Sequence, residues 1–135
     1  PDEFNYRKSL LGALSSGDVV VRYWGAVGLG LGSGEIPEVL LGALADDSSS
    51  VRVAAAQSVA LLGDPERAKG VLLESLKDED PWIRLMAVIA IDELDVIAQT
   101  VRDDLRPYRE DESKYVARVA NRILNRIEGT SERVR

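Results

Sequence analysis

The segment Ser48-Ser-Ser-Val51-Arg52 decides the fold, because altered copies of it occur on both sides along the chain. Each copy has a helix-capping residue, two further residues and an aliphatic–Arg pair, as in Asp18-Val-Val-Val21-Arg22 and Asp80-Pro-Trp-Ile83-Arg84. The three arginines are separated by 30 and 32 residues. This period is typical of stacked helical hairpins, which bury their apolar faces against their neighbours. The sequence therefore predicts an all-α chain, an α–α superhelix of about four helical hairpins and eight helices.

The second repeat shows how each hairpin begins and ends. We expect its first helix over residues 35–45, and a second helix that is capped by Ser48 and closed by Gly63 at position C′. The following helix opens with Asp64-Pro65, which places Asp at the N-cap and Pro at the first helical position. These boundaries predict one hairpin between residues 34 and 63.

The fourth repeat departs from the pattern of the other three. Ser113 lies three residues before Val116, as a capping residue should, but Ala117 takes the place of the arginine. Its first helix is expected over 95–106, ended by Pro107. A variant last repeat is typical of the end of a solenoid. The predicted repeats occupy residues 4–33, 34–63, 64–94 and 95–129 of a single domain over 1–129, followed by a tail over 130–135.

The amino-acid composition excludes several classes of function. The chain has 135 residues, of which 45% are hydrophobic and 5% aromatic, and it contains neither Cys nor His. Disulfides, thiolate nucleophiles and the commonest metal ligand are therefore excluded. We expect no metal, no cofactor and no enzymatic activity. The net charge of −6 disfavours nucleic acid as a partner. No apolar stretch reaches the roughly 18 residues of a membrane span, so no membrane partner is expected.

The chain begins with Pro1, and its one methionine is Met86. We therefore expect either a processed product or, in preference, a piece of a longer protein. A neighbouring domain of that parent chain then becomes a candidate partner. The compartment stays open at this stage: cytoplasmic by default, extracytoplasmic if the parent is secreted.

The run Val51-Arg-Val-Ala-Ala-Ala-Gln-Ser-Val-Ala-Leu-Leu-Gly63-Asp64 resembles the second helix of a HEAT repeat, of the short bacterial type also called phycobilin-lyase-type. The resemblance covers nearly the whole chain and implies a HEAT-like solenoid. It also implies that the arginine of each repeat contacts an acid in a turn. The expected ladder of charged contacts is Arg22, Arg52 and Arg84 with Asp18, Asp47 and Asp80. Binding of an anion by these arginines is the alternative.

A second resemblance is narrower. The run Val21-Arg-Tyr-Trp-Gly-Ala-Val-Gly-Leu29 is similar to runs in C-terminal helical extensions of some bacterial sulfatases. It covers the first repeat alone, and neither a sulfatase nucleophile motif nor a His is present. This resemblance implies that the chain is an accessory part of a sulfatase-like hydrolase rather than its catalytic part.

The repeat register predicts which side of each second helix faces outward. The aliphatic of the aliphatic–Arg pair and the small residue four positions later are expected to point into the hairpin. The opposite side is apolar in the first three repeats, as an interaction surface often is. The predicted interaction surface consists of Tyr23, Trp24, Val27, Val53, Trp82, Leu85, Met86 and Ile89. Curvature of the stack that buries this side is the alternative.

In the fourth repeat the outward side is basic instead. Its cations recur every four residues and form a basic stripe: Lys114, Arg118, Arg122 and Arg126. A phosphate, a sulfate or an acidic polymer would suit it, and so would a purely solubilising role.

These patterns predict a non-catalytic HEAT-repeat scaffold for protein–protein or interdomain interaction. Its partner would be a foreign protein, a neighbouring domain of the parent chain, or a second copy that forms a homodimer through the apolar side. One alternative is a phycobilin-lyase-like protein that handles a chromophore or a small ligand. The other is contact with an anionic polymer or nucleic acid through the basic stripe.

Overall fold

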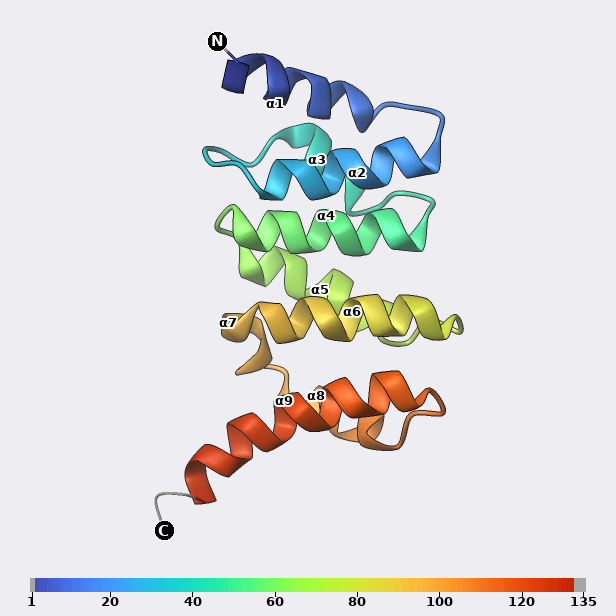
Figure 1. Ribbon diagram of the computed structural model, residues 1–135, viewed down its shortest axis with the longest axis vertical. Coiled ribbons are helices and arrows are strands. Elements are labelled where there is room, and N and C mark those ends of the chain that lie inside the picture. The colour runs from blue at the N-terminus through green and yellow to red at the C-terminus, as the bar shows by residue number, and fades with distance from the viewer. Residues whose placement is uncertain (1, 133–135) are drawn as a thin grey trace. The chain divides into compact units, whose positions relative to one another are not determined.

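The computed structural model describes residues 2–132, with side chains from 5 to 129, and over that range it contains helices and no strand (Figure 1). The predicted all-α class is confirmed. Nine α-helices and one 3₁₀ helix are present in this range, where eight helices were predicted. Two compact units, Pro1–Val71 and Leu72–Arg135, divide the chain inside helix α5 (Pro65–Ser75), and each is described by itself.

Unit 1 contains α1 (Asp2–Ala13), α2 (Val19–Gly30), α3 (Glu38–Ala43), α4 (Ser49–Leu61) and the first part of α5. Helix α2 packs against α1 and α4, and α3 packs against α4. Small and branched aliphatic side chains fill the space between these helices, as close helix packing requires. The buried core of this unit consists of Leu14, Ala26, Leu29, Leu40, Ala43, Val51, Ala54, Ala55 and Val59.

The helix ends of unit 1 follow the predicted caps, with two differences. Gly63 has φ +120°, as its C′ position requires, and the Asp64 carboxylate accepts the Arg67 amide at 3.1 Å. Ser48 has an extended N-cap backbone, but its hydroxyl bonds to the Ser50 hydroxyl at 2.9 Å and does not cap α4. The predicted helix over 35–45 is shorter, because Pro37 lies extended (ψ 144°) at its N-cap.

Helices α2 and α4 approach closely where both carry small residues. The buried Ser58 hydroxyl of α4 donates to the Ala26 carbonyl of α2 at 2.5 Å. A Cβ added to Gly30 would lie 2.8 Å from the Ser58 Cα, closer than real Cβ atoms come to backbone atoms. Gly30 is therefore required by packing.

The predicted inward positions are buried, with one exception. Val51, Ile83 and Val116 are buried, but Val21 is 41% exposed. The inward placement predicted for Val21 is therefore wrong.

Unit 2 contains the rest of α5 and the elements that follow it. They are α6 (Pro81–Glu93), α7 (Asp95–Ala98), α8 (Arg102–Leu105), the 3₁₀ helix η1 (Arg106–Glu110) and α9 (Lys114–Glu132). Helix α6 packs against α9, and η1 packs against the same helix. Residues 130–132 of the predicted tail belong to α9, and residues 133–135 lie outside the described residues. The single domain over 1–129 stays a prediction.

The helix predicted over 95–106 is broken into α7, α8 and the start of η1, which accounts for the ninth helix. At the break, the amide and the hydroxyl of Thr100 both donate to the Ile97 carbonyl, each at 2.9 Å. Ile97, Val101 and Leu105 are all buried, so this segment contributes to the core of unit 2 despite the break.

Candidate functional site

A partly buried salt bridge joins the two hairpins of unit 1. Arg22 lies near the start of α2 and donates from Nε to Asp46 Oδ2 at 3.0 Å and from Nη2 to Asp46 Oδ1 at 3.2 Å. Its Nη1 donates to the Ser16 carbonyl at 3.1 Å. Asp46 lies in the turn before α4 and also accepts the Ser48 amide at 2.9 Å. The two parallel bonds fix the orientation of one hairpin on the next.

Unit 2 contains the same arrangement. Arg84 of α6 donates from Nε and from Nη2 to the Asp111 carboxylate, both at 2.9 Å, and from Nη1 to the Asp78 carbonyl at 2.9 Å. Asp111 lies in the turn before α9 and accepts the Ser113 amide at 2.8 Å. The side chains of this pair are 13% and 7% exposed, less than those of the Arg22–Asp46 pair at 19% and 13%.

Arg52 forms the hydrogen bonds to nearby residues of its own repeat that Arg22 and Arg84 also form. It donates to the Asp46 carbonyl at 2.6 Å, to the Asp47 carbonyl at 3.3 Å and to the Ser49 hydroxyl at 2.7 Å. The carbonyl six residues earlier is thus a partner of Arg22, Arg52 and Arg84 alike. Side chains committed to protein carbonyls and carboxylates in this way support a structural role rather than binding of an anion.

The acids predicted to partner these arginines are not the ones that do so. Asp18 accepts the Val20 amide at 2.8 Å, and Asp80 accepts the Trp82 amide at 2.9 Å, so both carboxylates cap their own helices. Asp47 offers Arg52 its carbonyl rather than its carboxylate. The ladder predicted through Asp18, Asp47 and Asp80 is therefore wrong in its carboxylates, because two of them are already used as caps.

The two bridging aspartates have displaced pKa values. Burial raises the pKa of Asp46, but hydrogen bonds from Arg22 and from the Ser48 amide outweigh burial and hold it below its usual value. Burial likewise raises the pKa of Asp111, and the bonds from Arg84 and the Ser113 amide lower it further than burial raises it. Both carboxylates are charged at neutral pH, so both bridges are intact there.

The predicted interaction surface is only partly accessible in unit 1. Trp24 is 60% exposed, and its ring meets that of Tyr23 edge to face, with centroids 5.2 Å apart. Tyr23 and Val27 are half-buried and pack against the core of the unit. Val53 is only 2% exposed, so its outward placement was wrong. Its helix α4 is buried on several sides, which one helical register did not predict.

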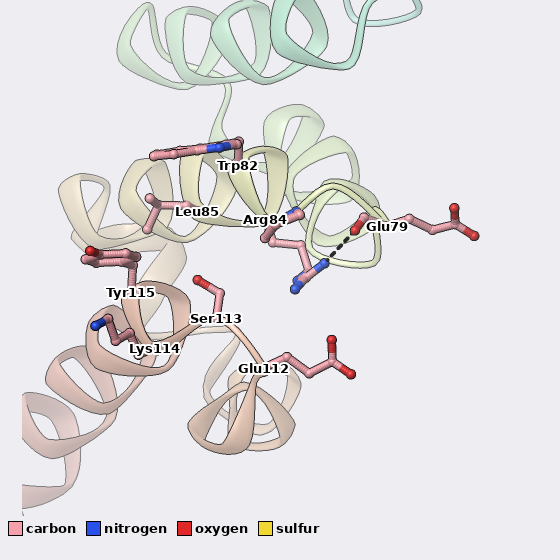
Figure 2. A pocket seen from close by; sticks show the side chains of 9 residues that line it. Glu79, Trp82, Arg84, Leu85, Glu112, Ser113, Lys114 and Tyr115 are labelled. Atoms are coloured by element: carbon pink, nitrogen blue, oxygen red, sulfur yellow. Dashed lines mark hydrogen bonds between the residues drawn. The ribbon is translucent and has the colours of Figure 1, made fainter.

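The residues predicted in unit 2 remain accessible. Trp82 is 68% exposed, Ile89 is exposed, and Leu85 and Met86 are half-buried on α6. Two of these four, Trp82 and Leu85, line a pocket of about 570 Å³ between the first turns of α6 and α9 (Figure 2). We call it the Trp82 pocket; its lining residues are Glu79, Pro81, Trp82, Arg84, Leu85, Glu112, Ser113, Lys114 and Tyr115.

Tyr115 is the residue that sequence reasoning missed. It is 51% exposed and lies two residues after Ser113, as Trp82 lies two residues after Asp80. Counting from the capping residue would therefore have found it. The Arg84–Asp111 bridge connects the walls that carry Trp82 and Tyr115, so the pocket has a fixed base.

The basic stripe is divided by its contacts. Arg122 and Arg126 both donate to the Asp92 carboxylate of α6, at 2.6 and 2.8 Å. Burial raises the pKa of Asp92, but the bonds from Arg126 and Arg122 outweigh it and leave that pKa lowered. Lys114 and Arg118 instead lie over the Tyr115 ring, 5.6 and 5.9 Å from its centroid. Half of the stripe therefore fastens α9 to α6.

A comparison with protein families matches residues 36–125 to HEAT repeats. The chain belongs to the HEAT repeat family. HEAT repeats are helical hairpins that stack on one another, and the predicted HEAT-like fold is confirmed. Among curated proteins, none matches the chain significantly.

HEAT repeats commonly mediate protein–protein interactions and typically serve as non-catalytic scaffolds. None of the described helices of this HEAT-repeat chain combines the length and apolarity needed to cross a membrane. Over the described residues, no three His, Cys, Asp or Glu side chains are grouped so that they could hold a metal ion. The lining of the Trp82 pocket combines aromatic, apolar and charged side chains.

Proposed function

We propose that this HEAT-repeat chain is a non-catalytic scaffold that binds a segment of a partner protein in the Trp82 pocket. The observation that carries the proposal is Trp82 itself. A tryptophan that is 68% exposed lines a pocket of about 570 Å³, with Leu85 and Tyr115 beside it. Tryptophan and tyrosine are enriched among residues that dominate binding energies, and they contribute most when a partner removes them from water.

The supporting structure of the pocket suits this role. Arg84 forms part of the lining, and its bridge to Asp111 fixes the start of α6 relative to the turn before α9. A binding surface that is already ordered loses little entropy on association. The Trp82 pocket therefore offers a rigid, partly apolar surface that a short protein segment would fill.

A peptide library tests the proposal, because it samples many candidate partner segments at once. Phage-displayed peptides are selected on the wild-type chain alone, and their affinities are then measured for the wild-type chain, for Trp82→Ala and, as the matched tryptophan control, for Trp24→Ala. We expect peptides that bind wild type and the Trp24 variant and lose at least tenfold in affinity on the Trp82 variant. Selected peptides that bind all three proteins equally would place the binding site elsewhere and reject the proposal.

The narrower resemblance of the first repeat supports a more specific version. In that version the partner is a neighbouring domain of a larger parent chain, such as a sulfatase-like hydrolase, and this chain is its accessory module. The sequence of the parent tests it: a sulfatase-like domain beside these repeats supports this version, and an unrelated neighbour rejects it. A homodimer through the same surface would instead appear as a concentration-dependent mass in light scattering.

A second candidate function is the handling of a small ligand or chromophore, as in phycobilin-lyase-type proteins. The volume of the Trp82 pocket favours it, because pockets of this size suit small molecules. A titration with a bilin, followed by absorbance, tests it: saturable binding that Trp82→Ala abolishes supports this candidate, and no spectral change removes it. Contact with an anionic polymer has less support, because Arg122 and Arg126 are committed to Asp92.

A further inference from the structure

The Trp82 pocket has an aromatic side and an acidic side. The aromatic side is formed by Trp82, Leu85, Lys114 and Tyr115 (Figure 2). The two carboxylates of the lining, those of Glu79 and Glu112, extend away on the far side of Arg84. A segment that contacts the Trp82 ring therefore meets Tyr115 and its surroundings rather than the glutamates.

Two cations border the aromatic side. Lys114 Nζ lies 5.6 Å and Arg118 Cζ 5.9 Å from the centroid of the Tyr115 ring, and both side chains are exposed. Within the part of the chain that the structure describes, neither forms a salt bridge with a carboxylate, unlike the other half of the basic stripe. A cation that rests on an aromatic ring keeps N–H donors with which it can bind a carboxylate. The aromatic side is therefore suited to an acidic group.

Resting on the proposed function, we infer that the partner segment combines an apolar residue with an adjacent acidic residue. The apolar side chain packs against Trp82, Leu85 and Tyr115, which removes both exposed rings from water. The adjacent carboxylate accepts hydrogen bonds from Lys114, and Arg118 adds to the attraction. Complementary charge of this kind selects one class of partner among the many apolar segments that would fit the rings alone.

The two tryptophans of the chain provide the readout, because each gives one indole N–H signal in ¹⁵N NMR, which Trp24→Phe and Trp82→Phe assign. The probe is acetyl-Glu-Leu-Glu-amide, with acetyl-Gln-Leu-Gln-amide and acetyl-Lys-Leu-Lys-amide as comparisons. We expect the glutamate peptide to shift the Trp82 signal saturably, to leave the Trp24 signal in place and to bind more tightly than the other two. General attraction to a chain of net charge −6 would instead favour the lysine peptide, so this order reports the charge at the pocket.

Removal of the two cations tests the pairing directly. Lys114→Gln with Arg118→Gln should weaken binding of the glutamate peptide by about fivefold, the effect of two exposed ion pairs, and leave the glutamine peptide within about twofold. A displaced Tyr115 ring would weaken both peptides alike, so the difference between them isolates the charge. The matched control, Lys8→Gln with Arg102→Gln, removes two exposed cations outside the pocket lining and should keep the glutamate peptide within about twofold of wild type.

Three results would overturn the inference. The first is a glutamate peptide that gives no saturable shift of the Trp82 signal or shifts both indole signals equally. The second is binding of the lysine or the glutamine peptide at Trp82 as tight as that of the glutamate peptide. The third is an equal effect of the Lys114 and Arg118 double variant on the glutamate and glutamine peptides. In each case the proposed function stands with a partner of different charge if library-selected peptides still lose affinity on Trp82→Ala, and it fails as well if they do not.

Discussion

The two units of this HEAT-repeat chain share one fastening and differ in the surface beside it. Arg22 bridges to Asp46 in unit 1 as Arg84 bridges to Asp111 in unit 2, and in both the aspartate also accepts the amide of the next capping residue. Two residues after the caps, however, the side chains differ. Unit 1 has Val20 and Ser50 at these positions, and unit 2 has Trp82 and Tyr115.

This difference distinguishes residues that hold the repeats together from residues that are exposed for binding. The bridge appears wherever two consecutive hairpins of one unit can be compared, so it belongs to the stacking of repeats. The aromatic pair is confined to unit 2, where the repeat framework does not require it. A repeat protein can therefore keep its geometry and change its recognition by altering the exposed positions alone.

Loss of a bridge should have the largest effect and should differ between the units. Arg84→Ala leaves Asp111 charged and nearly buried, so we expect the free energy of unfolding to fall by about 3 kcal/mol. Arg22→Ala should lower it less, by about 2 kcal/mol, because the Arg22–Asp46 pair is more exposed and better screened. Urea denaturation measures both.

The matched control for the bridges is Arg102→Ala on α8. This arginine is exposed, so we expect a change within about 0.5 kcal/mol. A larger loss for Arg22→Ala than for Arg84→Ala would contradict the ranking of the two bridges by burial.

The next largest loss of stability is expected when the close contact between α2 and α4 in unit 1 is disrupted. Gly30→Ala forces a Cβ against Ser58 and should lower the free energy of unfolding by about 2 kcal/mol. Gly70→Ala in α5 meets nothing within 4 Å and should raise it by about 0.5 kcal/mol, since alanine is the better helix former. Equal effects in thermal denaturation would show that α2 and α4 can separate without cost.

Acid should weaken both bridges. The folded-state pKa values of Asp46 and Asp111 are lowered, so their stabilisation is complete above the unfolded-state pKa of about 3.9 and is lost as the pH falls through the folded-state values. Asp46→Asn and Asp111→Asn should each reduce stability at pH 7 and flatten its decline below pH about 4. As the control, exposed Asp103→Asn should change stability at pH 7 by no more than about 0.5 kcal/mol.

Local signals in the sequence predicted most of the fold. The caps at Asp18, Asp64 and Asp80 and the C′ position of Gly63 follow from backbone groups that need partners within a few residues. The recurrent aliphatic–Arg pair predicted helical hairpins, which the HEAT-repeat match confirms. Such features are short-range and repeat along the chain.

Contacts between residues far apart along the chain were not predicted from the sequence. The bridge partners Asp46 and Asp111 lie 24 and 27 residues after their arginines. The nearer acids Asp18 and Asp80 were assigned to the arginines although they were already predicted as helix caps. The burial of Val53 depends on how many neighbours α4 acquires, which no single helix pattern contains. Tyr115 was overlooked because the position two residues after the capping residue was counted as outward in the third repeat alone, at Trp82.

The free energy of unfolding of Trp82→Ala tests the central claim, that Trp82 serves recognition and not stability. A side chain that is 68% exposed contributes little to the core, so urea denaturation should give a value within about 0.5 kcal/mol of wild type. A loss of about 3 kcal/mol or more, as for a buried tryptophan, would contradict the account and assign Trp82 to the framework.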